Sequence, residues 1–163
     1  MSRILTTVTG LGLAAAFAST ALAQGLVTQK NIPLAMAETI AQGALAQCQS
    51  MGFKVSVAVV DREGLTIVML RGDGSGLHTP EGAERKAFTA RTFGQPSADF
   101  VQRMKDRPDT AGSVQYTRVL ALPGGVPIKA GNEVVGAVGV SGSPGKDDVC
   151  SQAGIDKVAD QLK

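Results

Sequence analysis

Residues 122–150, LPGGVPIKAGNEVVGAVGVSGSPGKDDVC, contain in succession a turn, a hairpin, a buried strand, a glycine-rich loop and a helix start. Within residues 130–133, a glycine and an asparagine favour a tight reversal, because both residues tolerate positive φ. Residues 134–140 are apolar at every position except for glycines, which is typical of a central strand covered on both faces. Asp147 and Asp148 favour a helix start, because carboxylates interact well with the amino end of a helix. The stretch therefore predicts two antiparallel strands and then a helix.

The remaining elements are indicated by hydrophobic periodicity and by glycine and proline breakers. Asn31 is the predicted cap of a first helix, with Pro33 in its first turn, and Thr79 is the predicted cap of another. We expect a helix that ends near residues 51–52, strands over 54–60 and 65–70, helices over 79–93 and 98–105, strands over 114–122, 126–129 and 134–140, and a last helix over 147–162. The two expected hairpins indicate an antiparallel sheet with helices on both faces, which is a fold of the α+β class.

The composition indicates an ordinary globular protein. The chain has 163 residues, of which 44% are hydrophobic and 18% charged, and its net charge is +2. This length is enough for one domain with a core of its own, which we place over residues 24–163. Basic residues are not gathered into a stripe with interleaved aromatics, so we expect no nucleic-acid partner.

Residues 1–23 have the pattern of a signal peptide. Arg3 supplies the positive charge, residues 11–18 supply a short apolar core, and residues 21–23 read Ala-Leu-Ala, a small-x-small cleavage pattern. We expect cleavage before Gln24 and export to the periplasm or the medium. The apolar core is shorter than the roughly 20 residues that a membrane span needs, so no stable insertion is expected after cleavage.

The chain has two cysteines, Cys48 and Cys150, each on a predicted helix. An even pair in an oxidising compartment indicates a disulfide, and the alternative is two separate buried thiols. A bridge would close a loop of about 100 residues, worth about 4–5 kcal/mol in the chain-entropy model.

His78 is the only histidine, and it lies in a glycine-bounded loop at a helix start. A neutral imidazole is a good ligand for haem iron or for a divalent metal, although a lone histidine in a loop is more often plain surface. Arg85 and Lys86 follow on the same predicted helix. They could hold a carboxylate, or they could form ion pairs with Glu81 or Glu84 at helical spacing. Residues 141–145 lack the pattern of a phosphate-binding loop and are interpreted as a tight connection.

Two stretches carry a family resemblance. Residues 122–148 resemble the C-terminal signature of the GlcG/HbpS-type family, which includes the PduO C-terminal-like domain. Residues 73–90, DGSGLHTPEGAERKAFTA, resemble the DGAGPHT…RKAYTA pattern of its secreted members. The resemblance implies a profilin-like α/β/α fold with a five-stranded antiparallel sheet. In that layout the first and last helices share one face, where Cys48 would meet Cys150. It also implies a homo-oligomer.

The same resemblance implies that the protein binds haem rather than catalysing a reaction. His78 is then the candidate axial ligand and Thr79 a neighbouring oxygen donor, while Arg85 and Lys86 are candidates for holding a haem propionate or another carboxylate. The alternative is a non-haem enzyme or accessory protein that handles small hydroxy or keto carboxylates, with His78 as acid and base. A structural oligomer that serves a sensor is a third reading. No catalytic residue is assigned.

Overall fold

A four-stranded antiparallel sheet forms the middle layer of the computed structural model, which describes residues 25–163. The strand order is β2-β1-β4-β3. The strands are β1 (Ser56–Val60), β2 (Thr66–Arg71), β3 (Gly125–Ala130) and β4 (Glu133–Ser141). The hairpins β1–β2 and β3–β4 meet through the pairing of β1 with β4, so the apolar stretch predicted as a central strand is indeed in the middle of the sheet.

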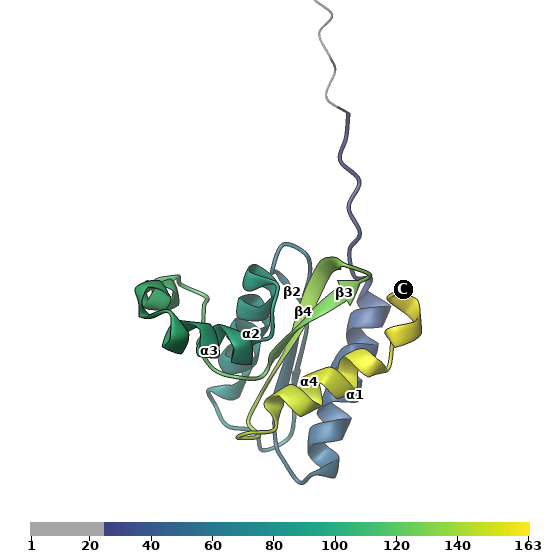
Figure 1. Cartoon of the computed structure of the whole chain (residues 1–163). Helices are drawn as coiled ribbons and strands as arrows, with labels where there is room; N and C mark the ends of the chain where they lie inside the picture. Colours follow the sequence, from purple (N-terminus) through teal and green to yellow (C-terminus); the bar gives the residue numbers. More distant parts are fainter. Residues whose placement is uncertain (1–24) are drawn as a thin grey trace, which may run out of the picture.

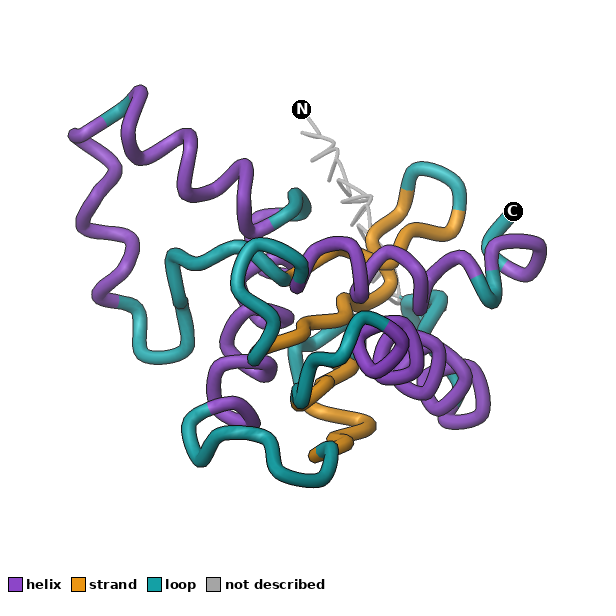
Figure 2. Tube along the Cα trace, turned by 90° about the horizontal axis from the view of Figure 1, so that it is seen from below, coloured by secondary structure: helices purple, strands orange, loops and turns teal. Residues whose placement is uncertain are grey.

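Helices cover both faces of this sheet (Figure 1). Helices α1 (Leu34–Ser50) and α4 (Asp147–Asp156) lie on one face, and α2 (Thr79–Phe93) lies on the other. Helix α3 (Ser97–Asp106) and the 3-10 helix η1 (Pro108–Gln115) extend away from the sheet beyond α2 (Figure 2). The α+β class and the layered arrangement are as predicted.

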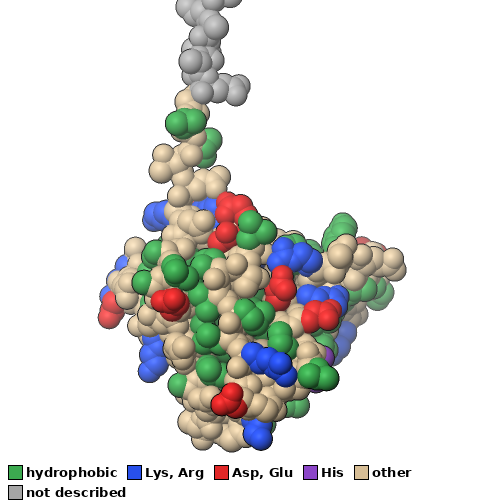
Figure 3. Space-filling view, turned by 180° about the vertical axis from the view of Figure 1, so that it is seen from behind, with side chains coloured by type: hydrophobic (Ala, Val, Ile, Leu, Met, Phe, Trp, Pro, Cys, Tyr) green, Lys and Arg blue, Asp and Glu red, His purple; other side chains and the backbone are tan. Residues whose placement is uncertain are grey.

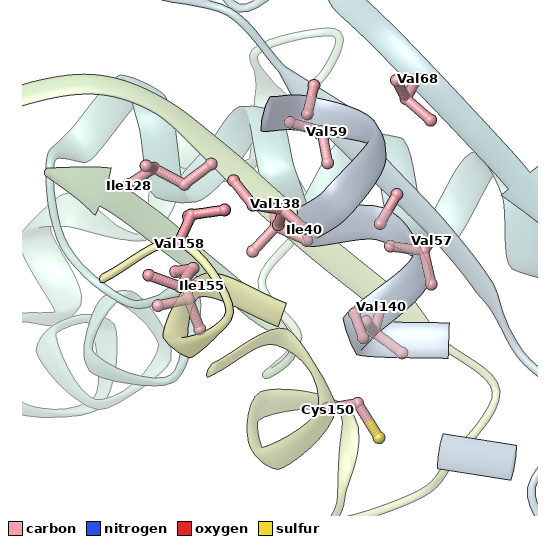
Figure 4. Packing of buried hydrophobic residues seen from close by; sticks show 14 of the residues in the cluster. Ile40, Val57, Val59, Val68, Ile128, Val138, Val140, Cys150, Ile155 and Val158 are labelled. Carbon is pink, nitrogen blue, oxygen red and sulfur yellow. The ribbon is translucent and has the colours of Figure 1, made fainter. Parts of the chain in front are cut away.

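The two faces of the sheet have different kinds of core. Between the sheet and the pair α1 and α4, branched aliphatic side chains pack together, among them Ile40, Val138 and Ile155 (Figure 4). On the α2 face the packing residues are mostly small, such as Ala87 and Ala137. The backbone of α2 therefore lies directly against the sheet. A Cβ added at Gly139 would collide with the carbonyl oxygen of Ala83, which is why this strand position requires glycine.

A disulfide joins α1 to α4. Cys48 and Cys150 lie 102 positions apart in sequence, their Cα atoms are 5.5 Å apart, and both side chains are fully buried. Figure 4 shows the Cys150 sulfur at the end of the larger core. The shared face of the first and last helices thus brings the two cysteines together.

The prediction of five strands is wrong, because residues 114–122 do not join the sheet. Side chains of α2 bind the backbone of this segment instead. Thr89 Oγ1 accepts a hydrogen bond from the Leu120 amide at 2.9 Å, and Arg85 Nη2 donates to the Val119 carbonyl at 2.9 Å. Val119 is buried, whereas Val114 and Tyr116 are exposed. The alternation that predicted a strand therefore belongs to a segment that lies along α2.

Several predicted boundaries also shift. Pro33 rather than Asn31 precedes the first turn of α1, and Asn31 instead accepts hydrogen bonds from the amides of Ile32 and Arg62. The last α-helix ends at Asp156 rather than near residue 162, and a short 3-10 helix, η2 (Ala159–Gln161), follows it. The predicted signal peptide lies outside the described residues. Among residues 25–163, no helix is long and apolar enough to cross a membrane.

Candidate ligand-binding site

His78 immediately precedes α2 and is exposed to solvent. Its ring lies against the backbone of Gly76, since a Cβ added there would be 3.0 Å from the imidazole Cε1 and 3.2 Å from Nδ1. Within residues 25–163 the imidazole makes no hydrogen bond and no ion pair. The ring thus contacts Gly76 on its Cε1 and Nδ1 side, and neither nitrogen has a partner among the described residues.

Thr79 anchors the start of α2 to the sheet. Its hydroxyl donates to the Gly76 carbonyl at 2.8 Å and lies 2.8 Å from the hydroxyl of Ser56 on β1. Only 1% of the residue is exposed. The Thr79 oxygen therefore faces the interior, and the residue fixes the position of the His78 backbone.

Lys86 is a buried cation in the middle of α2. Its ammonium donates to Asp147 Oδ2 at 2.7 Å and to the Val140 carbonyl at 3.2 Å. The other oxygen of Asp147 accepts two hydrogen bonds from Ser143, one from the amide at 2.9 Å and one from the hydroxyl at 2.6 Å. This network neutralises the charge of Lys86 and connects α2 to β4 and α4.

Arg85 is half-buried on the neighbouring side of α2 and binds Glu81 at 3.1 Å, one of the ion pairs weighed from the sequence. Its Nη2 also donates to the Val119 carbonyl. Glu84 pairs with Arg118 instead, at 2.9 Å. Arg85 thus lies beside the segment that follows η1.

These residues surround two adjoining cavities. The larger has a volume of about 490 Å³ and is lined in part by Lys54, His78, Thr79, Lys86, Leu122, Pro123, Pro144, Asp147 and Asp148. The smaller, of about 190 Å³, is lined in part by Glu81, Arg85 and Leu120. His78, Lys86, Leu122 and Ser141 belong to both. The four residues singled out from the sequence therefore meet at one place in the fold.

The family of the chain follows from a match over most of its length. Residues 32–156 match the family model described as haem degrading protein HbpS-like. The chain belongs to the HbpS-like family.

Individual relatives agree with this assignment. The crystal structure of a double mutant of HbpS from Streptomyces reticuli is 31% identical, with a TM-score of 0.77, over 94% of this chain and 97% of that one. An uncharacterized 15.0 kDa protein from the dhaT-dhaS intergenic region of Citrobacter freundii is 31% identical over 121 residues, which are 72% of this chain and 84% of the relative. The crystal structure of a PduOC:haem complex shares the fold, with a TM-score of 0.70, 22% identity and coverage of 77% and 94%.

Lys54 and Asp148 are charged residues of the cavity in this HbpS-like chain that were not predicted from the sequence as site residues. Lys54 precedes β1 and makes no ion pair within residues 25–163. Asp148 lies in the first turn of α4, and its Oδ1 accepts a hydrogen bond from the Gly124 amide at 2.6 Å. Burial raises the pKa of the Asp148 carboxyl, and the Asp147 charge acts in the same direction. The Gly124 hydrogen bond and the Lys86 charge oppose this shift. Both residues reach the cavity only through tertiary contacts.

The cavity suits a ligand whose metal ion takes a single bond from the protein. Within residues 25–163, no group of three or more His, Cys, Asp or Glu side chains could hold a metal ion. An axial bond to haem iron requires a single residue, and His78 is the histidine that lines this cavity. On the molecular face in Figure 3, basic and acidic side chains are interspersed, unlike the continuous basic stripe of nucleic-acid-binding proteins.

Proposed function

We propose that this HbpS-like protein binds haem in the larger cavity, with the His78 imidazole as the axial ligand. The observation that carries the proposal is the exposed, unbonded imidazole at the edge of that cavity. A neutral imidazole is a strong ligand for haem iron, and the ring contacts Gly76 at the edge of the cavity. The description of the family and the haem complex of PduOC support haem as the ligand.

Apolar surface for the porphyrin ring lies beside the imidazole. Leu77, which precedes His78 in sequence, is 89% exposed, and Leu122, which lines both cavities, is 50% exposed. Pro123 and Pro144 line the larger cavity. A flat apolar ring that covers these side chains would remove their surface from water, which favours binding by roughly 25 cal/mol for each Å² buried.

The propionates of haem need a cation that is not already neutralised. Asp147 neutralises Lys86, and Glu81 together with the Val119 carbonyl engages Arg85. Lys54 has no such partner among the described residues, and its side chain packs against Gly74 at the cavity. We therefore assign Lys54 to the propionates, whereas Lys86 holds the floor of the cavity and Thr79 positions His78.

We propose binding as the function, because residues 25–163 bring an exposed imidazole, apolar surface and a cation without an ion pair together at one cavity. Bound haem would supply an iron centre that accepts the imidazole nitrogen. The residues of the chain orient the ring, contact its apolar surface and balance the propionate charge.

We also propose that the mature protein begins at Gln24, is exported and forms a homo-oligomer. Amino-terminal sequencing of the exported protein and its mass in solution test these three points.

Haem titration of the protein lacking residues 1–23 tests the binding function. We expect saturable binding with one haem for each chain, and weaker binding of iron-free protoporphyrin, because the axial bond is lost. Lys54→Met should weaken haem several-fold, whereas Lys105→Met, an exposed cation on α3, should not. Unsaturable binding that is equal for haem and protoporphyrin would refute the proposal. Small hydroxy and keto carboxylates would then be screened by thermal shift.

A further inference from the structure

Ser143 lies between the disulfide and the floor of the cavity. It is fully buried, and its hydroxyl oxygen is 3.1 Å from the sulfur of Cys48 and 4.0 Å from that of Cys150. The same hydroxyl donates to Asp147 Oδ1 at 2.6 Å. One small side chain therefore contacts both the disulfide and a charged group that lines the cavity.

The contacts continue from Asp147 to the ligand side. Asp147 Oδ2 accepts from Lys86, which also donates to the carbonyl of Val140. Both Lys86 and Asp147 line the larger cavity. An unbroken chain of contacts thus runs from the Cys48 sulfur through Ser143 and Asp147 to Lys86.

The packing around the disulfide leaves little space for the two sulfur atoms to move. Ser143 gives its only hydroxyl proton to Asp147, so its close contact with the Cys48 sulfur contains no hydrogen atom. Reduction would separate the two sulfurs to van der Waals distance and add a hydrogen to each. Both cysteines are 0% exposed, and close-packed interiors resist added volume. Ser143 is the polar group in contact with the sulfurs, so it would be displaced.

We propose that the Cys48–Cys150 disulfide and the ligand cavity are coupled through Ser143, so that the disulfide form binds ligand more tightly than the dithiol form. In the switching step a dithiol reductant provides two electrons and two protons. The S–S bond breaks, two thiols form and the reductant becomes a disulfide. By linkage, bound ligand makes the disulfide harder to reduce by the same factor. The identity of the ligand rests on the proposed function, whereas the coupling between the sulfurs and Asp147 does not.

The first test needs no ligand. The full mature protein is equilibrated with dithiothreitol mixtures, thiols are trapped by alkylation, and the reduced fraction is measured by mass. Asp147→Asn should change the equilibrium constant for reduction by about fivefold or more in the presence of Ser143, and by less than about twofold in the Ser143→Ala background. Lys86→Met serves as a second variant if Asp147→Asn does not fold.

Ser151→Ala is the matched control. Ser151 is also a fully buried serine and neighbours Cys150 in sequence, but its hydroxyl donates to the Gly124 carbonyl at 2.7 Å. Asp147→Asn should therefore retain its full effect on reduction in the Ser151→Ala background. Equal effects of Asp147→Asn in all three backgrounds would overturn the coupling.

The second test uses haem as the probe. Haem is titrated into the wild type and into the double variant Cys48→Ala, Cys150→Ala, which avoids the reaction of dithiothreitol with haem iron. Folding of both is verified by circular dichroism. We expect the affinity for haem to fall about fivefold or more without the disulfide. When Ser143→Ala is also present in both proteins, the two affinities should differ by less than about twofold. Equal affinities of the wild type and the double variant would contradict the proposal. Failure of every protein to bind haem would refute the proposed function, and the reduction experiment would still decide the coupling.

Discussion

The Lys86 ammonium lies 2.7 Å from the Asp147 carboxylate, with only 6% and 10% of the two side chains exposed. This pair connects the middle of α2 to the first turn of α4 and forms part of the cavity floor. Two elements from opposite faces of the sheet are thereby joined beside the carboxyl end of β4. We therefore expect the shape of the cavity to depend on this contact.

Lys86→Met should destabilise the protein by about 3–5 kcal/mol, because it leaves the Asp147 charge buried without its partner. Chemical denaturation measures the loss. The double variant Lys86→Met, Asp147→Asn should recover a large part of the stability, since no buried charge then remains. A double variant no more stable than Lys86→Met alone would show that the pair is not the origin of the loss.

Removal of the disulfide by Cys48→Ala and Cys150→Ala should lower the free energy of unfolding by about 2–5 kcal/mol. The bond closes a loop with a sequence separation of 102, so most of the effect should come from the unfolded chain. Thermal unfolding by calorimetry tests the expectation. An unfolding temperature of the double variant equal to that of the wild type would contradict it.

Asp148 should make the protein less stable as the pH rises. Burial raises the pKa of this carboxyl in the folded protein above its ordinary value of 3.8. The folded state therefore holds the proton more strongly than the unfolded state, and that contribution is complete below pH 3.8 and lost as the pH rises through the raised value. Asp148→Asn keeps an acceptor for the Gly124 amide and lacks this titration. Relative to the wild type, its stability should increase as the pH rises from 3.8 through the raised pKa of Asp148, whereas a constant difference would be contrary to the account.

Thr89→Val should release residues 116–122 from α2. The change keeps the side-chain volume but leaves the Leu120 amide without its acceptor, at a cost of about 1–3 kcal/mol. Hydrogen exchange should accelerate in this segment. Thr92→Val, at an exposed position on the same helix, is the control and should leave exchange there unchanged.

The same segment shows what the sequence could and could not predict. Residues 134–140 were predicted as a central strand because a continuous apolar run of this length is typical of one, and they lie within β4. Residues 114–122 alternate like a strand, yet Thr89 and Arg85 bind their backbone from a distant part of the chain. Local periodicity contains no information about such contacts, so the fifth strand was predicted wrongly.

The residues of the candidate site also fall into two groups, those that a local motif could indicate and those that it could not. His78, Thr79, Arg85 and Lys86 lie within one loop and one helix, so a local motif could indicate all four. Lys54 and Asp148 come from opposite ends of the domain and meet the others only after the sheet has formed. The partner of Lys86 was likewise decided by tertiary packing, whereas the pair of Arg85 with Glu81 at helical spacing was one that the sequence indicated.

The axial bond from His78 is the central claim, and the absorbance spectrum of haem-loaded His78→Ala with and without added imidazole tests it most directly. We predict that the variant loses the wild-type Soret band and that free imidazole, which can occupy the vacated position, restores it. Arg107 is an exposed cation between α3 and η1, and the Arg107→Gln variant should retain the wild-type spectrum. A wild-type Soret band in His78→Ala without imidazole would contradict the account.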